Sequence, residues 1–377
     1  MPLLIHVVGA RPNFMKAAPV LAAIAKIAPE VTQRLVHTGQ HYDANMSDVF
    51  FTELGLPAPD VNLDVKSGQH GTQTAQIMMK FEELVLNERP DLVMVYGDVN
   101  STVAAALVCA KLAIPVAHVE AGLRSFDRSM PEEINRLVTD QLSDLHFTPS
   151  ADGDVNLLRE GIAKKKIHLV GNVMIDTLVR LRPAAQKKWM ELPKALGINS
   201  NWQERAYVLV TLHRPSNVDE PKRLREIIET LRKLSMTSNV IFPVHPRTRT
   251  HLEKSGFLTA DAAPASTGLI FTQPVGYLEF LALQEHARVI VTDSGGIQEE
   301  STYLGVRCIT LRANTERPVT VEQGTNILVG QDLEALRSEV AKALHGSKPQ
   351  HRIPPLWDGK AAERIAELVR QHFAQKN

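Results

Sequence analysis

The sequence predicts an α/β protein of two doubly wound domains, each a parallel sheet wrapped by helices. A chain of 377 residues is too long for one ordinary hydrophobic core. Short runs rich in Val, Ile and Leu alternate with longer helical patterns in both halves, as in parallel sheets joined by crossover helices. Nearly every run ends in polar residues, and ligands bind beyond the carboxyl ends of such strands. We therefore expect two sheet edges that face each other across a cleft.

The expected elements follow one another as strands and helices. In the first half these are Leu3–Val8 with Phe14–Ala28, Leu92–Tyr96 with Thr102–Leu112, and Val116–Val119 with Pro131–Leu142. In the second half the expected strands are Val208–Thr211, Val240–Val244, Val289–Thr292 and Cys308–Leu311. The strand-like run Ile167–Val170 precedes the boundary, so we predict one domain from residues 1–170 plus 361–377 and a second from 171–360. The last helical pattern, Ala361–Phe373, is expected to return to the first domain.

Composition excludes several classes of function. Lys plus Arg number 42 and Asp plus Glu number 42, so no net charge favours nucleic acid or an anionic membrane surface. Cys109 and Cys308 lie far apart in apolar runs, which argues against a disulfide framework and gives no zinc spacing. No apolar run approaches the ~20 residues of a membrane span, and the first residues lack a basic leader. We expect a cytoplasmic protein without a nucleic-acid or membrane partner.

The segment that joins the first strand to the first helix is a candidate anion site. Asn13 can cap this helix, whose free N–H groups and dipole favour an anion. Arg11 and Lys16 would add positive charge, and we place Lys16 in the first turn, where a lysine opposes the dipole unless a ligand compensates. The segment has neither a Walker loop nor a Gly-x-Gly-x-x-Gly fingerprint. The alternative is that Arg11 and Lys16 are ordinary residues of a loop and a helix.

Carboxylates follow two buried strands of the first half. Asp98 lies directly beyond the strand Leu92–Tyr96, where it serves either a ligand site or a turn and helix cap. Glu120 ends the next strand, and a carboxylate there is desolvated unless it is paired or functional. Glu132 and Glu133 begin a helix, and complementing the helix dipole is a sufficient explanation for one of them but need not explain both.

Histidines and a small-residue turn follow strands of the second half. One histidine at a strand end is commonly structural, whereas His213 and His245 at equivalent edges favour a ligand site. The turn Ser294–Gly296 joins a strand to a helix, so its N–H groups are placed to cradle a phosphate unless the turn serves tight packing alone. Glu299, one turn into that helix, is placed to reach a ribose diol.

Two patterns that look like metal sites have simpler explanations. Asp152 and Asp154 lie at a predicted helix start, where capping is the favoured role. His37 and His41 are separated by Thr38-Gly39-Gln40, which argues against a helical zinc pair. We therefore expect no metal ion and no other cofactor.

Taken as an ordered set, the motifs resemble those of the non-hydrolysing UDP-N-acetylglucosamine 2-epimerases of bacterial sugar-nucleotide metabolism. The set runs over nearly the whole chain, so it is more specific than any single segment. The matching segments are Gly9-Ala10-Arg11-Pro12, Gly97-Asp98, His118–Arg124, Pro131–Arg136, Gly171-Asn172, His213-Arg214, Pro243-Val244-His245-Pro246, Thr292–Glu300 and Thr315–Pro318.

The resemblance implies a GT-B-like pair of Rossmann-like domains, a homodimer, and UDP bound mainly by the second domain. It implies a reaction in which UDP is eliminated to leave 2-acetamidoglucal and is then added back, with the proton delivered to the other face of C2. The catalytic residues implied are Asp98, Glu120, Glu132 and His213. The substrate-binding residues expected are Arg11, Lys16, Arg136, His245, Ser294, Gly295, Gly296, Glu299 and Arg317.

Two alternatives share these motifs. The first half is also similar to epimerases of UDP-2,3-diacetamido-glucuronate, although those tend to carry Thr-Glu-Trp where this chain has Thr315-Glu316-Arg317. A GT-B glycosyltransferase would share the fold and the UDP site but require an acceptor. Several family members need their substrate as an activator, and at two positions that would bind it this chain has Asp43 and Pro215. We therefore expect no substrate activation.

Overall fold

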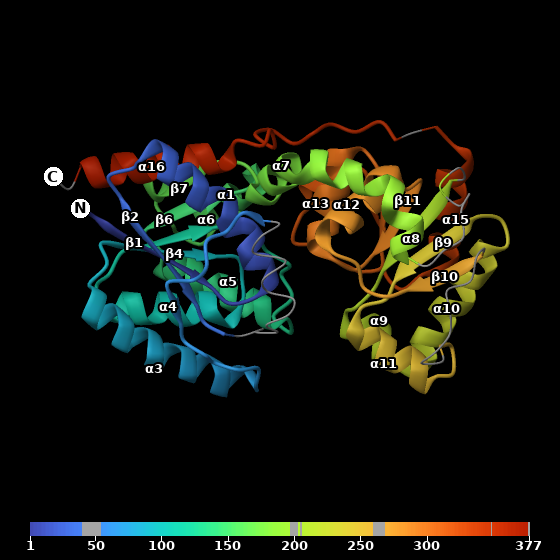
Figure 1. Ribbon diagram of the computed structural model, residues 1–377, viewed down its shortest axis with the longest axis horizontal. Helices are drawn as coiled ribbons and strands as arrows, with labels where there is room; N and C mark the ends of the chain where they lie inside the picture. The colour runs from blue at the N-terminus through green and yellow to red at the C-terminus, as the bar shows by residue number, and fades with distance from the viewer. Residues whose placement is uncertain (40–53, 197–202, 204–205, 259–267, 348, 376–377) are drawn as a thin grey trace. The chain divides into compact units, whose positions relative to one another are not determined.

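The computed structural model describes residues 1–39, 54–196, 203, 206–258, 268–347 and 349–375. The chain divides into two compact units, which are unit 1, Met1–Arg180 with Pro355–Asn377, and unit 2, Leu181–Pro354 (Figure 1). Where the functional domains divide, near residues 170 and 360, stays a prediction. Within the described ranges, no helix is long and apolar enough to cross a membrane.

Unit 1 is built on a seven-stranded sheet in the order β3-β2-β1-β4-β5-β6-β7, and all its pairs are parallel. The strands are β1 Leu3–Val8, β2 Thr32–His37, β3 Val61–Asn62, β4 Leu92–Tyr96, β5 Val116–Val119, β6 Leu145–Thr148 and β7 Ile167–Leu169. The helices are α1 Arg11–Ile27, α3 His70–Glu88, α4 Asn100–Lys111, α5 Pro131–Leu142, α6 Ala151–Arg159 and α16 Ala361–Ala374, and α7 Val173–Lys188 begins in unit 1 and ends in unit 2. The strand order reverses between β1 and β4, which is where doubly wound sheets bind ligands.

Helices cover both faces of the unit 1 sheet. On one face α3 packs on α4 and α4 packs on α5, while α1 and α16 lie together on the other face (Figure 1). Ile5 and Val95 belong to the core with Ile77 and Phe81 of α3. Since strands buried on both faces read as continuous apolar runs, the fully buried β4 fits its central position.

Unit 2 repeats the architecture with a six-stranded parallel sheet in the order β10-β9-β8-β11-β12-β13. The strands are β8 Tyr207–Thr211, β9 Asn239–Pro243, β10 Leu269–Thr272, β11 Val289–Thr292, β12 Arg307–Thr310 and β13 Asn326–Leu328. The helices are α8 Leu192–Leu196, α9 Pro215–Val218, α10 Pro221–Ser235, α11 Pro246–Lys254, α12 Tyr277–His286, α13 Gly295–Leu304, α14 Val319–Glu322 and α15 Leu333–His345. Here the order reverses between β8 and β11. The predicted fold class, two doubly wound parallel sheets, is confirmed.

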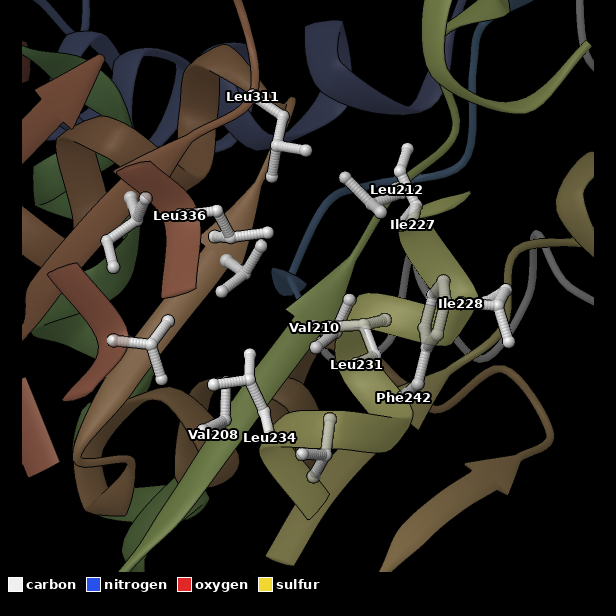
Figure 2. Packing of buried hydrophobic residues seen from close by; sticks show 14 of the residues in the cluster. Val208, Val210, Leu212, Ile227, Ile228, Leu231, Leu234, Phe242, Leu311 and Leu336 are labelled. Atoms are coloured by element: carbon white, nitrogen blue, oxygen red, sulfur yellow. The ribbon is translucent and has the colours of Figure 1, made fainter. Parts of the chain in front are cut away.

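The core of unit 2 lies between this sheet and an amphipathic helix. In α10 the residues Leu224, Ile227, Ile228, Leu231 and Leu234 recur at the helical spacing of three and four. They are buried against β-strand side chains that include Val208, Val210 and Phe242 (Figure 2). This packing holds the carboxyl ends of β8 and β9 in place.

The start of α1 differs from the sequence-based expectation. The helix begins at Arg11 instead of Phe14, with Ala10 as its N-cap. Asn13 does not occupy the cap, because it lies inside the first turn, where its Oδ1 accepts the N–H groups of Gly9 and Ala10 at 3.1 Å. Lys16 therefore lies in the second turn, so the predicted opposition to the helix dipole is wrong. The positive charge of Lys16 is instead paired with the carboxylate of Glu120, which follows β5.

Candidate active site

Unit 1 places two carboxylates at the carboxyl edge of its sheet, close to the switch point. Asp98 follows β4 and Glu120 follows β5, and the Gly97 N–H donates to the Val119 carbonyl across these strands at 3.0 Å. Asn13 Nδ2 of α1 donates to the Tyr96 carbonyl at 2.7 Å, which ties the start of α1 to the end of β4. Sequence reasoning placed the two carboxylates correctly at strand ends but missed this amide.

Glu120 forms a buried ion pair with Lys16, and both residues are only 6% exposed. The backbone of Glu120 has φ of +72°, a left-handed conformation that costs about 1–2 kcal/mol for a side chain other than glycine. The N–H groups of Glu120 and Ala121 both donate to the Phe147 carbonyl, at 3.0 and 3.1 Å, which holds this conformation. Such a retained strain at a strand end supports a functional site.

Gly97 makes room for this pair. Its φ is +62°, and a Cβ at this position would lie 2.6 Å from Lys16 Nζ and 3.2 Å from Glu120 Oε2. Only glycine therefore fits here without moving the ion pair.

Asp98 is held by α5. Its carboxylate forms an ion pair with the buried guanidinium of Arg136, and its carbonyl accepts from Asn135 Nδ2 at 2.8 Å. Glu132 is partly exposed and lies one helical turn before these two residues, so it is on the flank of α5 that approaches Asp98. We call Lys16, Asp98, Glu120, Glu132 and Arg136 the acid site.

The neighbouring Glu133 has structural contacts of its own. It is buried and accepts four hydrogen bonds, from the Ser125 N–H and Oγ at 2.8 Å, from the Phe126 N–H at 3.1 Å and from Arg136 Nη1 at 3.5 Å. Glu133 therefore fixes the turn after β5, which leaves Glu132 as the candidate for chemistry.

In unit 2, a buried aspartate joins the ends of β8 and β11 at the switch point. Asp293 accepts the N–H groups of His213 and Arg214 at 3.0–3.2 Å and Asn217 Nδ2 at 3.1 Å. His213 Nδ1 also lies 3.2 Å from Asp293 Oδ1. Sequence reasoning did not identify Asp293 as the group that orients His213.

The two predicted histidines lie together. The rings of His213 and His245 are 5.5 Å apart, and His245 Nδ1 accepts the Arg247 N–H at 3.2 Å. Burial lowers the pKa of the His213 imidazole below its ordinary value, although the Asp293 carboxylate opposes this effect. The side chain is still 38% exposed, so a ligand can reach it.

The guanidinium of Arg317, which comes from the segment after β12, lies beside the start of α13. Ser294 is the N-cap of α13, and a Cβ on Gly295, the first helical residue, would lie 2.5 Å from Arg317 Nη1. Arg317 Nε is 2.8 Å from Glu299 Oε1, so the carboxylate predicted to reach a ribose is paired with this arginine. Helical N–H groups and a guanidinium at one place favour a phosphate. We call His213, His245, Ser294–Gly296 and Arg317 the anion site.

A second carboxylate orients Arg317. Glu316 is buried, with Oε2 3.3 Å from Arg317 Nη1 and both oxygens bound by Arg312 at 2.7 and 2.9 Å. No sequence signal except the resemblance around Thr315–Pro318 marked Glu316. Arg11 is the first residue of α1, but its side chain lies outside the described part of the structure, as does the predicted regulatory residue Asp43. Among the described residues, no group of three or more His, Cys, Asp or Glu side chains is placed to hold a metal ion.

Two Rossmann-like units, each with charged side chains gathered beyond the carboxyl ends of its parallel strands, define an α/β protein of GT-B-like fold. The chain belongs to the UDP-N-acetylglucosamine 2-epimerase family, whose sequence model matches residues 24–370. The family predicted from the motifs is thus confirmed.

Similar proteins span nearly the whole chain. UDP-N-acetylglucosamine 2-epimerase of Methanocaldococcus jannaschii is 45% identical over 365 residues, which cover 96% of this chain and 97% of that protein. UDP-2,3-diacetamido-2,3-dideoxy-D-glucuronate 2-epimerase of Pseudomonas aeruginosa is 41% identical over 369 residues, 97% of this chain and 99% of that protein. A crystal structure of the M. jannaschii enzyme in complex with UDP-GlcNAc and UDP matches with a TM-score of 0.87 at 42% identity, over 98% of this chain and all of that chain.

Proposed function

We propose that this protein interconverts UDP-N-acetylglucosamine and UDP-N-acetylmannosamine by inversion at C2. The observation that carries the proposal is the acid site in a chain of this family: Asp98 and Glu120 lie at one sheet edge, and Glu132 lies in the first turn of α5, one turn before the Arg136 that pairs with Asp98. A UDP-sugar is the partner. A homodimeric assembly and a cytoplasmic location belong to the same proposal.

The chemistry of the sugar explains why such a site is needed. The C2–H of N-acetylglucosamine is not acidic, because C2 is not next to a carbonyl carbon. In the proposed reaction a base removes this proton while the C1–O bond breaks, so a C1=C2 double bond forms and UDP leaves with the bonding electrons. Return of UDP to C1 with a proton added to the other face of C2 inverts the centre. Acid and base groups are therefore required on both faces.

The two sites divide this work. In the proposal the carboxylates of the acid site take and return the C2 proton, and Lys16 and Arg136 hold Glu120 and Asp98 as anions in place. His213, Arg317 and the α13 start stabilise the negative charge that develops on the departing diphosphate. Arg11, His245 and Glu299 are further proposed substrate contacts.

The diacetamido-glucuronate is the second candidate substrate. It is favoured by the P. aeruginosa relative, whose identity to this chain is close to that of the M. jannaschii protein. We prefer UDP-N-acetylglucosamine because this chain carries Arg317 after Thr315-Glu316, where enzymes of the uronate tend to have tryptophan.

Each nucleotide sugar supplied alone, without an acceptor, distinguishes these candidates. We expect NMR spectra to show the C2 epimer of UDP-N-acetylglucosamine approaching an equilibrium ratio, with slower or no conversion of the uronate. Faster conversion of the uronate would reassign the substrate, and dependence on an acceptor would reassign the reaction to glycosyl transfer.

A further inference from the structure

The buried face of α5 is polar, unlike the apolar stripe with which a helix normally packs on a core. Its buried residues are Glu133, Arg136, Thr139 and Asp140. Glu133 and Arg136 have the contacts described above, with the turn after β5 and with Asp98. Asp140 lies one turn further along this face and belongs to neither predicted site.

Asp140 is fully buried and accepts hydrogen bonds at both oxygens. Oδ1 lies 2.7 Å from His118 Nδ1, and Oδ2 lies 3.1 Å from the Gly122 N–H and 2.7 Å from Arg124 Nη2. Burial alone would raise the pKa of Asp140, but the charge and hydrogen bond of His118 and the charges of Arg124 and His146 lower it to about 2. Asp140 is thus a carboxylate across the working pH range.

His118 transmits this restraint to the loop after β4. Its Nε2 lies 2.8 Å from the Gly97 carbonyl oxygen and donates to it. Gly97 directly precedes Asp98, and Gly122 lies two residues after Glu120. One carboxylate therefore holds both loops that carry the candidate catalytic groups, one through His118 and the other directly.

These loops require such a restraint. The backbone is left-handed at Gly97, Glu120 and Gly122, with φ of +62°, +72° and +81°. Arg124, by contrast, has a second partner, because Glu160 binds it at 2.6 and 2.8 Å. Charge compensation of Arg124 alone therefore does not explain why Asp140 also contacts His118 and Gly122.

We propose that Asp140, acting through His118, is a positioning residue that sets the geometry of Asp98 and Glu120. The proposal rests on the proposed function for its effect on turnover, but the geometry it describes can be measured without turnover. Because neither residue belongs to the anion site of unit 2, the effect falls on kcat and not on nucleotide affinity.

The test is Asp140→Asn, with Asp144→Asn as a matched control. Asp144 is close in sequence and accepts the Val116 N–H at 3.2 Å, but its other contact is the surface residue Lys166. We expect kcat for UDP-N-acetylglucosamine to fall about 10–100-fold in Asp140→Asn, as for other supporting carboxylates, while KM and UDP affinity change less than about threefold. Asp144→Asn should retain kcat within about twofold.

Hydrogen exchange read by mass spectrometry measures the loops directly. In Asp140→Asn we expect faster exchange in peptides that contain residues 97–102 and 120–124, and unchanged exchange in β1 and throughout unit 2. His118→Asn should reproduce the change at 97–102, and the two substitutions together should cost no more kcat than the larger single loss. His118→Asn also serves if Asp140→Asn fails to fold.

The outcomes separate the two proposals. If the wild-type protein does not convert the substrate but the exchange pattern appears, the function is wrong and the positioning stands. Wild-type exchange and kcat in both variants would overturn the positioning role. Faster exchange spread over all of unit 1 would overturn it too, because that pattern indicates a merely structural residue.

Discussion

Gly97→Ala is the perturbation for which the structure gives the sharpest expectation. A Cβ at Gly97 would lie 2.6 Å from Lys16 Nζ, so the lysine must leave Glu120 or the loop must move. Gly161→Ala is the matched control, because Gly161 also has positive φ, +87°, but nothing lies within 4 Å of the added Cβ. The difference between the two variants therefore isolates the contact with the ion pair.

Two contributions set the expected loss of stability: the strain of the left-handed backbone and the displacement of the ion pair. The left-handed backbone costs an alanine about 1–2 kcal/mol in either variant. Separating a buried ion pair costs up to about 3–5 kcal/mol, and a partial displacement costs less. At about 2–4 °C per kcal/mol for a unit of this size, full separation of the pair would place the melting temperature of Gly97→Ala about 6–20 °C below that of Gly161→Ala, and a partial displacement would lower it by less.

Calorimetry and turnover should be measured on both variants. We expect Gly161→Ala to retain wild-type kcat and Gly97→Ala to lose at least about tenfold, because a shifted Glu120 is no longer aligned for proton transfer. Equal melting temperatures and equal kcat in the two variants would refute the assignment of Lys16 and Glu120 as a required pair.

Four further predictions follow. Asp98→Asn should lower turnover by roughly 10²–10⁴ with UDP affinity within a few-fold, and near-normal turnover would remove Asp98 from the mechanism. UDP should raise the melting temperature in the presence of a chelator, since the α13 start and Arg317 supply the positive potential; a shift only with magnesium would contradict this. Burial raises the pKa of Asp176 to about 6, so the folded state binds this proton more tightly than the unfolded state does, and the free energy of unfolding should decline as pH rises from about 4 to 6. Asp176→Asn should flatten this pH dependence. An unchanged pH profile in the variant would exclude Asp176 as its source. Initial rates should depend hyperbolically on the concentration of UDP-N-acetylglucosamine, because Asp43 and Pro215 offer an activator's phosphates no donor side chain. A lag in the reaction started from UDP-N-acetylmannosamine alone would show that the protein is activated by substrate after all.

The architecture was predictable because buried parallel strands are recognisable in one sequence. Runs such as Leu92–Tyr96 and Val289–Thr292 have the same bounds in the structure, since continuous apolar character and flanking turns are local signals. Among the described strands, β2, β3, β6, β10 and β13 were not predicted. The edge strands β3 and β13 have only two or three residues of mixed polarity, which carry no such signal. Which strands neighbour one another was not specified by local pattern at all.

Asp98, Glu120, His213 and His245 were predictable for the same reason, because each lies within two residues of a strand end, whereas Glu132 was predictable from the start of a helix. Their partners were not. The contact between Lys16 and Glu120 joins residues 104 positions apart, and Asp176 binds the N–H groups of Ala361 and Ala362 at the start of α16 across more than 180 positions. Such contacts depend on the tertiary fold, and no spacing in the sequence records them.

The Asp140 network shows where local reasoning fails most clearly. Asp140 lies near the end of a helix whose polar residues look solvated in sequence, because a helical pattern rich in charges normally faces water. In the structure it is one of four polar residues on the buried face. Only the packing of α5 beside the loops after β4 and β5 reveals this.

Isotope exchange at C2 tests the central claim most directly. The purified protein should be incubated in D₂O with UDP-N-acetylglucosamine alone, and the product should be followed by proton NMR and mass spectrometry. The account predicts UDP-N-acetylmannosamine that carries deuterium at C2, because the proton removed by the acid site exchanges before one is returned. Epimer that retains its original C2 hydrogen, or no epimer while UDP still binds, would contradict the account.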